Sequence, residues 1–215
     1  MERNKKVEII LVGMLVLQAV VSAVLFPNLP DRIPAHWNID GQVDRWMSPF
    51  GSITLFFCLS IGLYLLFWVI PLLDPKKKIA VKQKAYNAIR LVAQSCLLLF
   101  FFFVMAAAFG FPFPIDRIIP AVVSIMIIIF GNYMGKIRPN YFMGFRTPWT
   151  LEDPVVWQKT HRVGGPILML AGFIGLIGCF LGRKTSVFLL ITPMLAGCLF
   201  IVGYSWYQFQ RLHPK

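Results

Sequence analysis

The chain has 215 residues, of which 58% are hydrophobic and 14% charged, and its mean hydropathy is +0.70. A soluble domain is about 45–50% apolar and about 25% charged, so a soluble fold of this size has no core that can bury the surplus, and apolar surface must face lipid. The formal net charge is +12, and the basic residues lie between the apolar runs. No nucleic-acid-binding motif accompanies them, so direct binding of nucleic acid is not expected.

Six apolar runs are long enough to cross a bilayer as helices, because a helix rises about 1.5 Å per residue and the hydrocarbon layer is about 30 Å thick. They lie at 7–26, 53–73, 89–111, 118–135, 165–181 and 187–207. Pro27 and Asn28, rather than a small-residue cleavage site, follow the first run, which favours a retained helix over a signal peptide. We therefore predict an all-α membrane protein, a six-transmembrane-helix bundle.

The basic residues predict the orientation of the bundle. With a cytoplasmic N-terminus, five of the 21 Lys and Arg residues lie outside and the remaining 16 inside. The outside residues are Arg32, Arg45, Arg117, Arg183 and Lys184. A dense inner group is Lys76, Lys77, Lys78, Lys82 and Lys84. We expect a multi-pass protein with both termini in the cytoplasm and anionic lipids as partners of its inner loops.

The chain divides into two three-helix halves, 1–116 with an outer loop at 27–51 and 117–215 with an inner loop at 136–164. Halves of three helices have opposite orientations, as in the inverted repeats of transporters, so a small transporter or exporter is one alternative function. The middles of the spans hold no ionisable residue, and Glu8 and Arg90 at span ends are expected to snorkel. Gly172, Gly175 and Gly178 are expected to allow close helix packing.

The outer loop is expected to form a compact Ω-type loop that caps the extracellular end. Residues 38–41 are typical of a turn with Gly41 at positive φ, and Asp–Arg pairs are expected to hold the cap. His36, Asp40 and Asp44 are four apart, but that spacing suits a metal only on a helix, which Gly41 opposes, so we expect no metal and no cofactor. The candidate ligand-binding residues are Asp31, Arg32, His36, Trp37, Asp44 and Trp46.

The inner loop is expected to contain a short interfacial cytoplasmic helix from about 151 to 163, broken at 164–166 by Gly-Gly-Pro. Thr150 and Asp153 approximate its capping box. On such a helix, Trp157 and His161 share one face with Pro154. The candidate binding residues here are Arg146, Thr147, Trp149, Thr150, Asp153, Trp157, His161 and Arg162.

Three side chains of the inner loop carry specific expectations. Trp149 and Trp157 are expected to lie in the headgroup layer. Arg146 is expected to do one of two things. It either binds a carboxylate, which belongs to Glu152, to Asp153 or to a partner, or it holds the loop in place or binds a lipid phosphate.

The run GFRTPWTLEDPVVWQKTHR, residues 144–162, resembles the signature of the SdpI family of bacterial membrane immunity proteins. The stretch LPDRIPAHWNIDGQVDRW, residues 29–46, resembles a domain of unknown function often joined to that family. With the six spans, the resemblance covers nearly the whole chain.

The resemblance implies a six-helix, non-enzymatic protein of a bacterial cytoplasmic membrane. It would protect its host from a secreted toxic (antimicrobial) peptide, and it would also sense the toxin and signal to a cytoplasmic transcriptional repressor. Besides the transporter, a membrane-embedded enzyme using Arg146, Asp153 and His161 is a further alternative.

Overall fold

The computed structural model describes residues 3–75 and 84–214. Within these residues six helices are long and apolar enough to cross a membrane, which confirms the predicted all-α membrane fold. The helices are α1 (Lys5–Leu25), α2 (Pro49–Leu73), α3 (Lys84–Ala108), α4 (Ile115–Met134), α6 (Pro154–Leu181) and α7 (Arg183–Leu212). The basic residues Lys76, Lys77, Lys78 and Lys82 lie outside the described residues.

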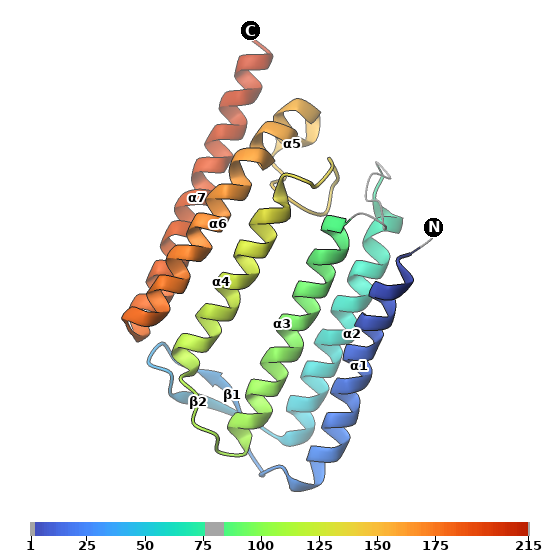
Figure 1. Cartoon of the computed structure of the whole chain (residues 1–215), viewed down its shortest axis with the longest axis vertical. Helices are drawn as coiled ribbons and strands as arrows, with labels where there is room; N and C mark the ends of the chain where they lie inside the picture. Colours follow the sequence, from blue (N-terminus) through green and yellow to red (C-terminus); the bar gives the residue numbers. More distant parts are fainter. Residues whose placement is uncertain (1–2, 76–83, 215) are drawn as a thin grey trace.

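The helices run up and down, so both chain ends lie at one end of the bundle and a β-hairpin lies at the other (Figure 1). We call these ends the terminus face and the hairpin face. Helices α1 and α2 pack on α3, α3 packs on α4, and α6 lies between α4 and α7 (Figure 1). The protein is therefore a multi-pass bundle in which α3 and α4 join the two halves.

Small residues bring α4 and α6 into close contact. A Cβ on Gly131 of α4 would lie 2.7 Å from the carbonyl oxygen of Gly165 of α6, and a Cβ on Gly165 would lie 2.7 Å from the carbonyl oxygen of Gly131. A Cβ on Gly172 would lie 2.8 Å from the carbonyl oxygen of Ser124. Helices in lipid associate largely through such packing of small residues, so this contact holds the C-terminal half together.

The predicted helix break at 164–166 is wrong, because α6 continues from Pro154 to Leu181. Gly165 serves the contact with α4 instead of ending the helix. Pro166 removes one backbone hydrogen bond, which a packed membrane helix tolerates. Most of the predicted short helix at about 151–163 is helical, but it forms the start of α6, and a separate short helix, α5 (Pro148–Glu152), precedes it.

The outer loop is an antiparallel β-hairpin rather than an Ω-type loop. Its strands are β1 (Ile33–Trp37) and β2 (Val43–Met47). The predicted turn is confirmed, since Gly41 has φ 76° and its amide donates to the carbonyl of Asn38 at 2.9 Å. Pro34 lies within β1, where a proline is tolerated because each strand of a two-stranded sheet is an edge.

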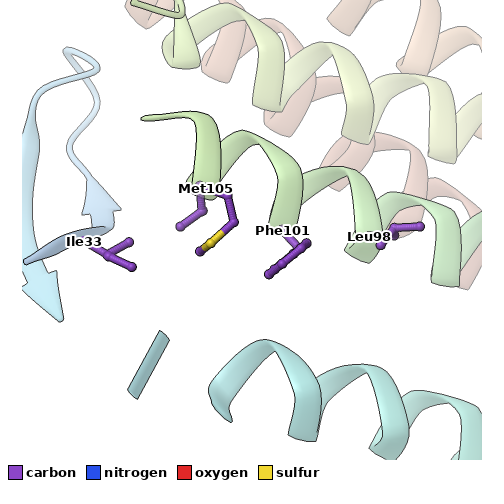
Figure 2. Close-up of a cluster of buried hydrophobic side chains, with 5 residues drawn as sticks. Ile33, Leu98, Phe101 and Met105 are labelled. Atoms are coloured by element: carbon purple, nitrogen blue, oxygen red, sulfur yellow. The ribbon is translucent and has the colours of Figure 1, made fainter. Parts of the chain in front are cut away.

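The hairpin is fixed to the bundle from both halves. Ile33 is completely buried against Phe101 and Met105 of α3 (Figure 2). At the tip of the hairpin, Asp40 lies 3.7 Å from Lys184 at the start of α7. The hairpin therefore connects α3 to α7 across the hairpin face.

Candidate functional site

The inner loop between α4 and α6 is held in one conformation by the buried side chain of Asn140. Its Oδ1 accepts hydrogen bonds from the amides of Phe142 at 2.8 Å and Met143 at 2.7 Å. Its Nδ2 donates to the carbonyl oxygens of Arg138 at 2.8 Å and Met143 at 3.2 Å. All the hydrogen-bonding capacity of this amide is therefore used to shape the loop.

His161 lies at the centre of the inner loop, where both of its ring nitrogens are bonded. Its Nε2 accepts from the amide of Phe145 at 2.9 Å, and its Nδ1 faces the carbonyl oxygen of Trp157 at 2.8 Å. Because an amide always donates and a carbonyl always accepts, the ring must be the neutral tautomer with its proton on Nδ1. The ring also stacks on that of Trp157, with centroids 4.0 Å apart.

The glycine and phenylalanine that open the GFRTPWT run position His161. Gly144 has φ 102°, and a Cβ on it would overlap Nε2 of His161. The ring of Phe145 lies where a Cβ of Gly164 would be. The run therefore requires glycine at 144 both for its backbone conformation and for the close approach of the imidazole.

Two threonines of the same run form the capping box of α5. The Thr147 side chain accepts from the amide of Thr150 at 3.2 Å, and the Thr150 hydroxyl accepts from the amide of Thr147 at 2.9 Å. The predicted box of Thr150 with Asp153 is wrong, because α5 begins one turn earlier. The Thr147 hydroxyl also shares a hydrogen bond of 3.1 Å with the hydroxyl of Ser205, which joins the loop to α7.

Asp153 caps α6 instead. Its carboxylate accepts from the amides of Val155 at 2.6 Å and Val156 at 3.2 Å, and it contacts Nε2 of His213 at 2.9 Å. Partial burial raises the pKa of this carboxyl, but the bonds from His213 and the two amides outweigh it and hold the pKa below its ordinary value. An anion here is also stabilised by the helix dipole.

Arg146 does not clamp Glu152 or Asp153, because its Nη1 donates to the carbonyl oxygen of Tyr141 at 2.7 Å. This contact agrees with the alternative that Arg146 holds the loop in place, and the rest of the Arg146 side chain is exposed.

Trp157 does not face the lipid headgroups directly, since this residue is 1% exposed and its Nε1 donates to the carbonyl oxygen of Ile137 at 2.9 Å. Trp149 is half-buried, and Arg162 is exposed.

The hairpin brings together only some of the outer candidates. Nδ1 of His36 lies 2.6 Å from Oδ1 of Asp44 on the surface, whereas Trp37 packs inward on the cluster around Ile33. Trp46 is 54% exposed and therefore available on the surface of the hairpin. Asp31 and Arg32 are exposed. The described part of the cap is held by the His36–Asp44 hydrogen bond and the Asp40–Lys184 ion pair, not by the Asp–Arg pairs that were predicted.

Metal ligation finds no support in this geometry. Over residues 3–75 and 84–214, no three side chains of His, Cys, Asp or Glu are grouped so as to hold a metal ion.

One charged pair was missed by sequence reasoning. Arg90 of α3 is 2% exposed and donates to both carboxylate oxygens of Glu8 of α1, at 2.7 and 3.1 Å. The Tyr64 hydroxyl of α2 donates to the same carboxylate at 3.1 Å. Arg90 therefore does not snorkel; it joins three helices. The one available signal was an Arg inside an apolar run, for which a buried partner is the usual explanation.

Two family models match this sequence. A domain of unknown function (DUF1648) matches residues 13–61, which contain the whole hairpin, and the SdpI/YfhL protein family matches residues 136–205, which run from the inner loop into α7. The chain is thus similar to the SdpI/YfhL family over residues 136–205. It is 27% identical over 210 residues to "Immunity protein SdpI" of Bacillus subtilis (strain 168), covering 97% of this chain and 98% of that protein. No solved structure matches the chain.

The SdpI/YfhL match contains His161 with its bonded partners, and it also contains Ser205 of α7, which shares a hydrogen bond with Thr147 of the inner loop. Within this match, Phe145, Thr147 and Trp157 contact other parts of the protein and hold the run at 144–162 in place.

Proposed function

We propose that this protein is a bacterial membrane immunity protein that protects its host cell against a secreted toxic peptide. The observation that carries the proposal is its similarity, over nearly the full length of both chains, to a protein named as an immunity protein. That similarity does not favour the transporter or exporter alternative.

In this proposal the hairpin face lies outside the cytoplasmic membrane and both termini lie in the cytoplasm. Support comes from the distribution of charge, with 16 of the 21 Lys and Arg residues assigned to the terminus side. A secreted toxin would then meet the hairpin first. The exposed side chains there include an aromatic ring, a cation and a hydrogen-bonded acid, which are Trp46, Arg45 and Asp44. Such groups suit recognition of a peptide.

A non-enzymatic mechanism agrees with the contacts of the inner loop. Both ring nitrogens of His161 are bonded, Asp153 caps a helix, and Arg146 bonds a loop carbonyl. These three residues, which the enzyme alternative requires to act together, each make a separate structural contact. A catalytic base needs a nitrogen or oxygen within reach of a substrate proton.

A sensing role would use α7 as its physical connection. Near the start of this helix Lys184 approaches Asp40 of the hairpin at 3.7 Å, and near its end Ser205 bonds Thr147 of the inner loop at 3.1 Å. A toxin that shifts the hairpin would thereby move the inner loop through α7, which contacts both. We propose that the exposed inner loop, with Arg146 and Arg162 at its surface, then contacts a cytoplasmic repressor.

A killing assay tests the immunity proposal. The host strain, a strain deleted for this gene, and the deletion strain carrying each variant are challenged with the secreted killing peptide. We expect the deletion strain to die at lower doses than its parent. If it stays as resistant as its parent, the proposal is wrong.

The variants locate the surface that meets the toxin. Trp46→Ala is preferred to Trp37→Ala because Trp46 is exposed and its loss leaves the core intact. Trp206→Ala is the matched control, since this tryptophan is 50% exposed and lies in α7 towards the terminus face. Loss of protection with Trp46→Ala alone would support the hairpin as the toxin-binding surface, whereas equal protection by both variants would contradict it. Arg146→Ala should keep protection and lose signalling.

A further inference from the structure

A pocket of about 460 Å³ opens on the terminus face between the end of α4 and the start of α6. It is lined by Gly135, Lys136, Ile137, Arg138, Pro139, Pro154, Trp157, Gln158 and His161. A volume of this size suits a small ligand rather than a folded protein segment.

The pocket lies at the depth of the lipid headgroups. Its lining residues 135–139 directly follow the last residue of α4, Met134, and its other wall begins with the first residue of α6, Pro154. Both helices are long and apolar enough to span a bilayer, so their ends on this face mark the boundary of the hydrocarbon layer. Phosphate is the polar group that is most concentrated at this boundary.

The charge of the pocket is one-sided. Lys136 and Arg138 line it with exposed cationic side chains, and among the described lining residues none is acidic. Over the described part of the chain, the Arg138 guanidinium has no hydrogen-bond partner or counter-ion, and the contact of this residue is through its carbonyl oxygen, which accepts from Asn140. The nearest acid in sequence, Asp153, is bonded to amides of α6 and to His213.

The lining of the pocket includes the stacked rings of Trp157 and His161, which we call its floor. Both rings are held by hydrogen bonds to the backbone, and the imidazole is neutral because of the bonds of its two nitrogens. The amide of Gln158 adds an exposed polar group beside them. Cations above an apolar, preorganised floor match a phosphodiester attached to a glycerol backbone.

We propose that this pocket binds the phosphate headgroup of an anionic phospholipid, held by Arg138 and Lys136 over the Trp157–His161 stack. The site is independent of the proposed immunity function, because it rests on the pocket, its charge and its depth alone. It fixes the inner loop to the membrane at the point where the family's signature run folds.

Native mass spectrometry of the full chain purified in detergent tests this site. The probes are dioctanoyl phosphatidylglycerol and dioctanoyl phosphatidylcholine, whose added choline cation is repelled by two basic side chains. We expect tighter binding of phosphatidylglycerol. A charge near the membrane surface is worth about 1 kcal/mol, so Arg138→Gln should weaken the apparent Kd about fivefold, and Lys136→Gln with Arg138→Gln about thirtyfold.

Two matched controls remove the same charge elsewhere. Arg211 lies on the terminus face and Arg45 on the hairpin face, and both are exposed. Neither Arg211→Gln nor Arg45→Gln should change the Kd for phosphatidylglycerol. If the double variant does not fold, Arg138→Gln decides the question, because this side chain is exposed and its guanidinium forms no hydrogen bond or ion pair with the described residues.

Four results would overturn the site. These are unchanged binding by Arg138→Gln, equal binding of the two lipids, displacement of phosphatidylglycerol by equimolar inorganic phosphate, and displacement by equimolar polyglutamate. The third would indicate a site for free anions, and the fourth a site for an acidic protein segment.

Discussion

Replacing Glu8 with Gln should destabilise the protein more than the loss of one hydrogen bond would suggest. Arg90 is 2% exposed and its two hydrogen bonds to Glu8 are 2.7 and 3.1 Å long, so the variant leaves a cation buried between helices without its counter-ion. Breaking one side of a buried ion pair costs about 3–5 kcal/mol. Because the Glu8 side chain is 19% exposed, we expect a value near the lower end, about 3 kcal/mol.

The assay is the free energy of unfolding in detergent micelles, measured by titration with sodium dodecyl sulfate and followed by circular dichroism. Glu152→Gln is the control, because it removes the same charge from an exposed position. The double variant Glu8→Gln with Arg90→Gln should lose only about 1 kcal/mol, since it leaves no charge buried. The reasoning is refuted if Glu8→Gln is as stable as Glu152→Gln, or if the double variant is less stable than the single one.

Three further predictions concern the inner loop and the orientation. Gly144→Ala should lose about 2–4 kcal/mol in the same titration, because the new methyl group meets His161 at a positive φ, and wild-type stability would contradict this. Asp153→Asn should be less stable than wild type at pH 7; since the folded pKa of Asp153 is depressed, the difference should disappear as the pH falls through that pKa, and a constant difference would refute the charge effect. With the native cysteines replaced by serine, Asp31→Cys should react with an impermeant maleimide in intact cells and Arg146→Cys only after permeabilisation, and the reverse pattern would invert the proposed topology.

Some features were predictable because they depend on local composition. The six spans follow from runs of apolar residues, since every backbone group in lipid must be bonded within its own helix. The turn at Gly41 follows from the chemistry of four successive residues. The pairing of strands across that turn was not predicted, because Pro34 and Pro30 oppose regular structure and only the contact of Ile33 with α3 decides the outcome.

The inner loop shows the opposite case. Its sequence suggested a helix start near Thr150 and a break at Gly165, but Thr150 belongs to the cap of an earlier helix and Gly165 lies inside a continuous one. Thr150 pairs with the helix cap at Thr147, and Gly165 packs on Gly131 of another helix. Glycine and threonine have several uses of similar free energy, so the partner from a distant segment selects among them.

By itself the sequence determined that this protein lies in a membrane with six spans, that its basic residues are unevenly distributed among the loops, and that two of the loops are long and unusual in composition. Only the tertiary structure decided what the charged and aromatic side chains of those regions do. Arg90 is paired with Glu8, 82 positions away in the chain, and His161 is held by Phe145 and Trp157. Spans are set by the local preference of each segment for lipid, whereas a buried charge or imidazole is satisfied only by the partner that folding places beside it.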